Sequence, residues 1–342
     1  MKAIVKTGIG EDQLELKDWP EPVPAADEVK LRIAYAGICG TDIHIIKGEW
    51  PCNPPVVLGH EFCGTVAEIG SAVTGFKVGD RLVASNPAQT CGICLYCRAG
   101  NPFMCHKRIS AGYMIDGAFA EYLCMRQERC HKLPDAITNR QAALGEPLSV
   151  AVHAVMERTT VHAGDLVLVS GPGCVGILTA AVAKLEGAFV IVAGTGKDAQ
   201  RLACAKEMGA DIVVDISRED LLDVVRHHSR GLGADVVYEC AGASQSLELC
   251  WETAKRGGSL VPVGIYPGLI TTDFNKVTMK ELSVIGSFGY VWTSWQRTIR
   301  LLADRQIHCE KLISHELPPH MFLEAFNLNR AGSAIKVVFN MS

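Results

Sequence analysis

Between Leu166 and Gly176 the chain reads LVLVSGPGCVG, an apolar run followed by the glycine spacing G-x-G-x-x-G. The run predicts a buried strand, and the apolar residues 177–185 predict a helix directly after the glycines. In that setting Gly171 permits a tight turn, Gly173 lets a pyrophosphate approach the backbone, and Gly176 lets the helix pack closely on the sheet. Unpaired N–H groups at the start of the helix attract an anion. We therefore predict a dinucleotide site, with an ordinary glycine-rich turn as the alternative.

Strands alternate with helices along the chain after this motif. Apolar runs at 190–193, 212–214, 236–238 and 259–263 predict strands, and the segments between them predict helices. Such alternation is typical of a parallel sheet that is covered by helices. The sequence therefore predicts an α/β fold with a doubly wound parallel sheet of the Rossmann type.

The two ends of the chain have a different pattern. Residues 1–145 carry short apolar runs separated by Pro, Gly and Asp turn signals, which is typical of a β-rich domain. Residues 295–339 predict helix before a terminal strand. We expect a catalytic domain over 1–147, a nucleotide-binding domain over 148–289, and a return to the catalytic domain over 290–342.

Composition excludes several classes of protein. The 342 residues are 48% hydrophobic and 20% charged, unlike a disordered or fibrous chain. With 33 basic and 37 acidic residues, a net charge of -4 and no dense basic run, nucleic acid is not an expected partner. We see neither a membrane-spanning run nor a secretion signal, and we expect a cytoplasmic protein. In a reducing compartment the 14 cysteines favour metal binding over disulfides.

The segment after the second strand bears on which dinucleotide binds. An acidic residue normally meets the adenosine ribose there, but this chain has Gly194-Thr-Gly-Lys197. Hydrogen-bond donors and positive charge at this place favour the 2′-phosphate of NADP(H). The alternative is that Asp198 reaches the ribose and NAD binds. The candidate cofactor contacts are Gly171, Gly173, Val175, Gly176, Thr195, Lys197 and Arg201.

Four thiols lie close together in one segment, at C-x2-C-x2-C-x7-C spacing. Four thiolates complete the tetrahedral shell of Zn²⁺ and leave no open position, which indicates a structural site. An iron-sulfur cluster is the less favoured alternative, because the last gap is long and no proline follows the fourth cysteine. These candidate ligands are Cys91, Cys94, Cys97 and Cys105.

A second set of metal-binding side chains is dispersed along the chain. It comprises Cys39, His60, Glu61 and Glu146. Thiolate, imidazole and carboxylate together suit a catalytic zinc, which keeps three protein ligands and one open position. Either glutamate could supply the third ligand. Each residue by itself is more often part of a core, so this prediction depends on the set as a whole.

The residues from Gly59 to Val73 read G-H-E-x2-G-x5-G-x2-V, which resembles the signature of the zinc-containing medium-chain dehydrogenases. Glu61 together with EPLSVAVH, from Glu146 to His153, resembles the sorbitol (polyol) dehydrogenase branch of that family. The resemblance implies that the β-rich domain has the GroES-like fold and that the substrate is an alcohol, a polyol or a sugar derivative. It also implies a homotetramer or dimer.

The resemblance further implies hydride transfer from the substrate carbon to NAD(P), with zinc as Lewis acid at the substrate oxygen. Thr41 is expected to hydrogen-bond that oxygen, His44 to pass a proton to solvent, and Asp42 to orient His60. Sorbitol dehydrogenases carry Phe-Arg-Tyr where this chain has Gly289 between Phe288 and Tyr290, which argues against sorbitol itself. A threonine-type substrate ranks second, and a non-catalytic NAD(P)-binding zinc protein is the alternative from another class.

Overall fold

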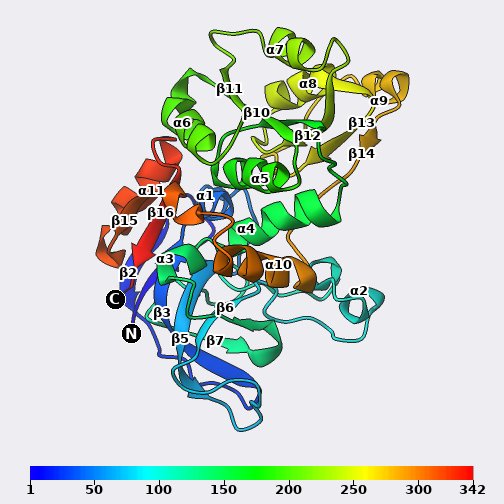
Figure 1. Cartoon of the computed structure of the whole chain (residues 1–342). Coiled ribbons are helices and arrows are strands. Elements are labelled where there is room, and N and C mark those ends of the chain that lie inside the picture. The colour runs from blue at the N-terminus through cyan, green and yellow to red at the C-terminus, as the bar shows by residue number, and fades with distance from the viewer. Residues whose placement is uncertain (342) are drawn as a thin grey trace. The chain divides into compact units, whose positions relative to one another are not determined.

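The computed structural model describes residues 1–341 and divides into two compact units (Figure 1). The first unit comprises residues 1–146, 291–304 and the segment from 309 to the end of the described chain. The second unit comprises residues 147–290 and 305–308. The chain therefore leaves the first unit, builds the second and then returns.

A six-stranded parallel sheet forms the centre of the second unit, in the order β11-β10-β9-β12-β13-β14. Strand β9 carries the apolar run before the glycines, and all five of its residues are buried. The chain moves outward from β9 to β11 and then crosses to β12 on the other side of β9. The predicted Rossmann-type sheet is therefore confirmed, with its order reversing between β9 and β12. The strands are β9 (Leu166–Ser170), β10 (Phe189–Gly194), β11 (Ile212–Asp215), β12 (Ala234–Glu239), β13 (Ala254–Pro262) and β14 (Ser283–Val284).

Helices connect these strands and bury apolar side chains against them. Leu221 and Val225 of α7 and Trp251 of α8 join a core with Leu168 and Val237 of the sheet. Asp220 begins α7, because its Oδ1 accepts the N–H of Leu222 at 2.8 Å and so satisfies a free donor of the first turn. The helices of this unit are α4 (Gly145–Val152), which starts in the first unit, α5 (Cys174–Leu185), α6 (Ala199–Glu207), α7 (Leu221–His228), α8 (Ser244–Thr253) and α9 (Asn275–Lys280), with π-helix η3 (His153–Glu157) and 3-10 turn η4 (Gly196–Asp198).

The first unit is built on a seven-stranded sheet in the order β15-β16-β3-β5-β6-β8, with β7 also paired to β3. Strand β3 pairs antiparallel with β5, β7 and β16, so it lies at the centre of the sheet. The strands are β3 (Glu28–Gly37), β5 (Glu61–Ile69), β6 (Arg81–Ala84), β7 (Tyr122–Arg126), β8 (Cys130–Lys132), β15 (Ile313–Leu317) and β16 (Lys336–Asn340), and β1 (Lys2–Lys6), β2 (Leu14–Asp18) and β4 (Val56–Val57) form a small second sheet.

Short helices flank this sheet, and a cluster of aromatic rings packs within its largely aliphatic core. Phe119 packs edge-on against Phe339 of β16 and Phe326 of α11, with ring centroids 5.1 and 6.1 Å apart. The helices are α1 (Gly40–Ile46), α2 (Leu95–Arg98), α3 (Asn139–Ala142), α10 (Trp292–Ala303) and α11 (Phe322–Arg330), with 3-10 turns η1 (Pro102–Met104), η2 (Gln127–Arg129), η5 (Cys309–Leu312) and η6 (Pro319–Met321). Among residues 1–341, no helix is long and apolar enough to cross a membrane.

His131 is a buried imidazole that holds α10 against β8. Its ring lies 4.3 Å from Trp292 and 5.1 Å from Trp295, centroid to centroid, and its Nε2 is 3.2 Å from Ser85 Oγ. Burial lowers the pKa of His131 to about 3, against an ordinary value of about 6.5. Protonation of His131 therefore disfavours the folded state.

We expect acid to destabilise the protein through His131. Between pH 6.5 and 3 the His131 imidazole is protonated in the unfolded chain but stays neutral in the folded protein. The free energy of unfolding therefore rises with pH in this window and reaches its full value above it. The loss at pH 5 is about 2 kcal/mol. In His131→Phe, which keeps the stacking, the fall in Tm between pH 7 and pH 5 should be smaller than in the wild type. His227→Gln, at an exposed site, is the control. Equal falls in wild type and His131→Phe would contradict the assignment.

Candidate metal centres and nucleotide site

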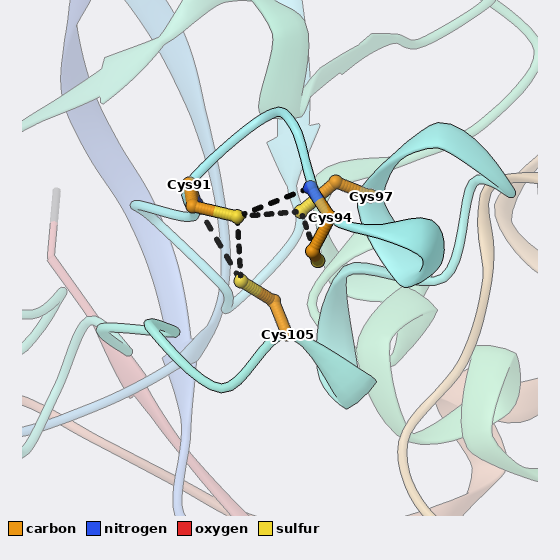
Figure 2. Close-up of side chains that lie close together, drawn as sticks. All are labelled: Cys91, Cys94, Cys97 and Cys105. Atoms are coloured by element: carbon orange, nitrogen blue, oxygen red, sulfur yellow. Dashed lines mark hydrogen bonds between the residues drawn. The ribbon is translucent and has the colours of Figure 1, made fainter.

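The four clustered cysteines meet in a single loop of the first unit (Figure 2). The Sγ–Sγ distances are 3.5 Å for Cys94 and Cys97, 3.6 Å for Cys91 and Cys105, and 3.9 Å for Cys91 and Cys97. A tetrahedral zinc with Zn–S bonds of about 2.3 Å requires sulfurs about 3.8 Å apart, whereas a disulfide requires about 2.05 Å. The four thiols therefore fit a zinc ion and form no disulfide with one another.

Backbone N–H groups in this loop favour the negatively charged form of its thiols, which suits a cation. The N–H groups of Ile93 and Cys94 point at the Cys91 sulfur and lower its pKa to about 6, which favours thiolate at neutral pH. The backbone N–H of Cys97 favours the thiolate of Cys94, but burial and the neighbouring thiols raise the pKa of Cys94 to about 11. Four thiolates in this loop would repel one another without a positive charge between them. A bound dication would permit all four thiolates.

The second cluster is made by the pairing of β3 with β5. Gly37, the last residue of β3, lies opposite Glu61, the first residue of β5. Cys39 follows two residues after Gly37, at the start of α1, and His60 directly precedes Glu61. As a result the ligand atoms of Cys39, His60 and Glu61 all lie within 4.8 Å of one another. Thiolate, imidazole and carboxylate in one place are a donor set that suits zinc.

Asp42 contacts two members of this cluster, Cys39 and His60. Its Oδ2 accepts the N–H of Cys39 at 2.8 Å, and its Oδ1 lies 3.5 Å from His60 Nδ1. Burial lowers the pKa of His60, but the neighbouring Asp42 carboxylate and Cys39 together raise it well above its ordinary value. With Nδ1 directed at a carboxylate, Nε2 is the imidazole atom presented to a metal.

Glu61 is paired with a buried lysine of the C-terminal strand. The Nζ of Lys336 contacts the Glu61 carboxylate and donates to the carbonyl of Ile38 at 2.9 Å, and both charged side chains are almost fully buried. A side chain at Gly37 would not fit, because a Cβ there would stand 2.5 Å from Glu61 Oε2. Sequence reasoning missed Lys336. Its only signal was a lone basic residue entering the apolar strand 336–340.

The remaining candidates of the first unit lie around this cluster or on neighbouring elements. Glu146 is buried in the first turn of α4 and lies outside the group of three ligand atoms. Thr41 is in the first turn of α1, and its Oγ1 is 3.7 Å from Cys39 Sγ. His44 lies on the same helix, with its Nδ1 2.6 Å from Glu49 Oε2.

The glycine-rich loop of the second unit has the predicted local structure. Gly173 precedes α5 directly, and Val175 lies in the first turn of that helix. Gly171 has φ +102°, and a Cβ there would lie 2.7 Å from the backbone nitrogen of Ala241. A Cβ at Gly176 would lie 1.9 Å from the carbonyl oxygen of Gly171. The glycines thus make a tight turn and a close helix-to-loop contact, as a dinucleotide loop requires.

The residues after β10 are tied together by Asp198. Its Oδ2 accepts from the backbone nitrogen and Oγ1 of Thr195 at 2.9 and 2.8 Å, and its Oδ1 accepts from Arg201 Nη1 at 3.0 Å. Lys197 is exposed. Thr195, Lys197 and Arg201 therefore lie on one short segment, as expected, with a carboxylate between two of them.

We expect Cys97→Ser to remove zinc from the clustered-cysteine site and to lower stability. The ion would cross-link the loop from Cys91 to Cys105, and a cross-link of this size contributes about 3 kcal/mol. The Tm should therefore fall by about 5–10 °C. Cys124→Ser is the matched control, because Cys124 belongs to neither cluster. Thermal unfolding and metal analysis check this, and an unchanged Tm together with unchanged zinc content would refute a structural metal there.

Two family profiles match most of the chain. Residues 25–135 match the profile described as Alcohol dehydrogenase GroES-like domain, and residues 174–304 match the profile described as Zinc-binding dehydrogenase. A solved structure of a zinc-binding dehydrogenase from Sinorhizobium meliloti 1021, bound to NADP, superposes with a TM-score of 0.91 at 31% identity and covers 99% of this chain and 98% of that one.

Curated relatives align over almost their whole length. The chain is 39% identical to the sorbitol dehydrogenase of Halalkalibacterium halodurans, with 99% of this chain and 98% of that protein covered. It is 38% identical to the D-arabitol-phosphate dehydrogenase of Enterococcus avium, with coverages of 99% and 97%. It is 37% identical to the L-threonine 3-dehydrogenase of Pyrococcus horikoshii, with coverages of 99% and 98%. The chain therefore belongs to the zinc-dependent medium-chain family of alcohol and polyol dehydrogenases, and it is an NAD(P)-linked alcohol dehydrogenase.

Proposed function

We propose that this enzyme interconverts a secondary alcohol of a polyol or sugar-derived substrate and the corresponding ketone, with the first unit as catalytic domain and the second as nucleotide domain. The observation that carries the proposal is the convergence of Cys39, His60 and Glu61, because three donors of this kind suit a zinc with an open position. The similarity to sorbitol and D-arabitol-phosphate dehydrogenases supports a polyol-like substrate.

We propose two zinc ions per chain with different roles. Cys91, Cys94, Cys97 and Cys105 would hold a closed structural zinc. Cys39 and His60 would hold the catalytic zinc with Glu61 as third ligand, and Glu146 is the alternative third ligand. A zinc held there supplies a Lewis acid that polarises the oxygen of the substrate.

The surrounding side chains prepare this site before substrate arrives. Asp42 fixes His60 and the Cys39 backbone, and Lys336 balances the charge of Glu61. We propose that the Thr41 hydroxyl hydrogen-bonds the reacting oxygen. His44, held at Nδ1 by Glu49, would pass the released proton from Nε2 to solvent.

Replacing Cys39 with Ser should abolish turnover without affecting nucleotide binding. A serine hydroxyl is a poor zinc ligand, so we expect kcat to fall at least about 1,000-fold and one of the two zincs to be lost. The Kd for the reduced cofactor, measured by fluorescence titration, should stay within about twofold, because the binding loops are in the other unit. Cys52→Ser is the control, since Cys52 belongs to neither metal cluster. Retained activity in Cys39→Ser would exclude the catalytic-zinc assignment.

We propose that the enzyme prefers NADP(H) over NAD(H). At Gly194, the end of β10, there is no acidic side chain that would repel a 2′-phosphate, and Lys197 and Arg201 bring positive charge. The five donors of a guanidinium can serve Asp198 and a phosphate together. The bonds of Asp198 to Thr195 and Arg201 are what favours the alternative, in which this carboxylate meets the ribose of NAD.

A substrate panel measured with both cofactors tests the substrate class and the cofactor together. Polyols, phosphorylated polyols and L-threonine should be compared by kcat/KM, and we expect a polyol compound to exceed threonine by at least about tenfold. Threonine is included because of the similarity to the Pyrococcus horikoshii enzyme. NADP should exceed NAD, and Arg201→Gln should weaken NADP alone, while Arg226→Gln on α7 changes neither. A threonine optimum would replace the proposed substrate class, and a large advantage for NAD would refute the NADP preference.

We also propose that the enzyme is a cytoplasmic homo-oligomer, either a tetramer or a dimer. The clustered thiols without disulfides suit a reducing compartment. Light scattering after size-exclusion chromatography measures the assembly directly.

A further inference from the structure

Glu239 is a fully buried carboxylate at the carboxyl end of β12, in the second unit. Its Oε1 accepts the N–H of Ala241 at 2.9 Å, that of Gly242 at 3.1 Å and the hydroxyl of Ser246 at 2.6 Å. Its Oε2 accepts the hydroxyl of Tyr266 at 2.9 Å and shares the N–H of Gly242 at 3.2 Å. All four donor groups are neutral. Burying a carboxylate with no positive charge beside it costs free energy, so such a group is retained where it has a structural or functional role.

The groups around Glu239 come from the loops that follow β12 and β13 and from helix α8. Ala241 and Gly242 follow β12, and Tyr266 follows β13. The carbonyl of Glu239 also accepts the N–H groups of residues 263 and 264, at 2.8 and 2.9 Å. Ser246 extends the network to β9, because its Oγ lies 2.8 Å from the Oγ of Ser170, the residue before the glycine-rich loop. One carboxylate thus connects the ends of β9, β12 and β13.

These loops approach one another backbone to backbone around the carboxylate. A Cβ at Gly242, which has φ +63°, would lie 2.4 Å from the carbonyl oxygen of Ile265. A Cβ at Gly264 would lie 2.5 Å from the nitrogen of Gly242 and 2.9 Å from Glu239 Oε2. A side chain at either glycine would therefore force the loops apart. The hydrogen bonds of Glu239 and this close packing together join the two loops.

The location of this network connects it to the nucleotide. Ligands of doubly wound sheets bind beyond the carboxyl ends of the strands, where the strand order reverses, and here that is the edge shared by β9 and β12. Burial and the adjacent carboxylate raise the pKa of Tyr266, so its hydroxyl stays protonated and donates. All the hydrogen-bond partners of Glu239 in this network are groups of the protein itself, so the network can order the loops in advance and reduce the cost of binding.

We propose that Glu239 is a positioning residue for the dinucleotide: it holds the loops that follow β12 and β13 beside the end of β9, in the conformation that binds NAD(P). This inference rests on the proposed nucleotide role of the second unit and adds a residue that no glycine motif contains. Glu239 touches the loops and not the reacting atoms, so its effect should appear in cofactor affinity more than in turnover.

The variant Glu239→Gln tests this with little change of shape. The amide of Gln has an NH₂ group in place of one carboxylate oxygen. Because both oxygens of Glu239 accept hydrogen bonds, this NH₂ group would face another donor and at least one bond would be lost. We expect the Kd values for NADH and NADPH, measured by fluorescence titration, to rise about 10–30-fold. At saturating cofactor, kcat should change less than about threefold. Tyr266→Phe removes a single donor and should raise both Kd values by a smaller factor, about 2–5-fold.

Asp235→Asn is the matched control, because Asp235 lies near the start of β12 and accepts the N–H of Leu166 at 2.7 Å and a bond from Lys255, at the opposite, amino ends of the strands. It should lower Tm while leaving both Kd values unchanged. Wild-type Kd values in Glu239→Gln, or a fall in kcat alone, would overturn the inference. If Glu239→Gln does not fold, unchanged Kd values in Tyr266→Phe would overturn it instead. A wild-type enzyme that binds neither NADH nor NADPH would refute the proposed function, a result distinct from these.

Discussion

The antiparallel register between β3 and β5 is the constraint on which the proposed catalytic centre depends. With Gly37 opposite Glu61, Cys39 and His60 are brought to the same end of the sheet. The last strand adds to the same point, since β16 pairs with β3 and places Lys336 against Glu61. A shift by one residue would turn every side chain of the strand to the other face and separate the donors. A change of register would also separate Lys336 from Glu61 and leave each charge unpaired in the core, which would cost free energy.

Negatively charged side chains are stabilised in three different ways in this chain. In the cysteine loop, backbone N–H groups favour the thiolate of Cys91, and a bound metal would balance the charge of all four thiolates. At the β3–β5 end, a buried lysine balances one carboxylate while Asp42 orients the imidazole. At the edge of the parallel sheet, Glu239 is held by neutral donors alone. The first arrangement suits a closed structural ion, the second an exchangeable ligand position, and the third a fixed loop conformation.

Local patterns could be predicted from the sequence, and long-range pairings could not. The glycine-rich turn and the four-cysteine loop each lie within about fifteen consecutive residues, so spacing alone predicts their geometry. The fold class and the family were confirmed for this reason. The choice between Glu61 and Glu146 stayed open because it depends on strand register, and Lys336 was missed because its partner Glu61 lies in a distant segment. Glu239 was missed because its partners are backbone N–H and hydroxyl groups that form no recognisable motif. Strand β15 was also missed: residues 295–339 predicted helix, but Ile313–Leu317 pairs with β16, where tertiary pairing overrides a weak local preference.

The division of the metal into two unlike sites can be measured directly by zinc analysis combined with X-ray absorption at the zinc edge. One closed site of four sulfurs and one open site with a single sulfur predict two zincs per chain and about 2.5 sulfur ligands per zinc, the remainder being nitrogen and oxygen. In Cys39→Ser the mean should rise toward about four sulfurs as the open site empties. A single zinc per chain in the wild type, or two zincs bound only by sulfur, would contradict the account.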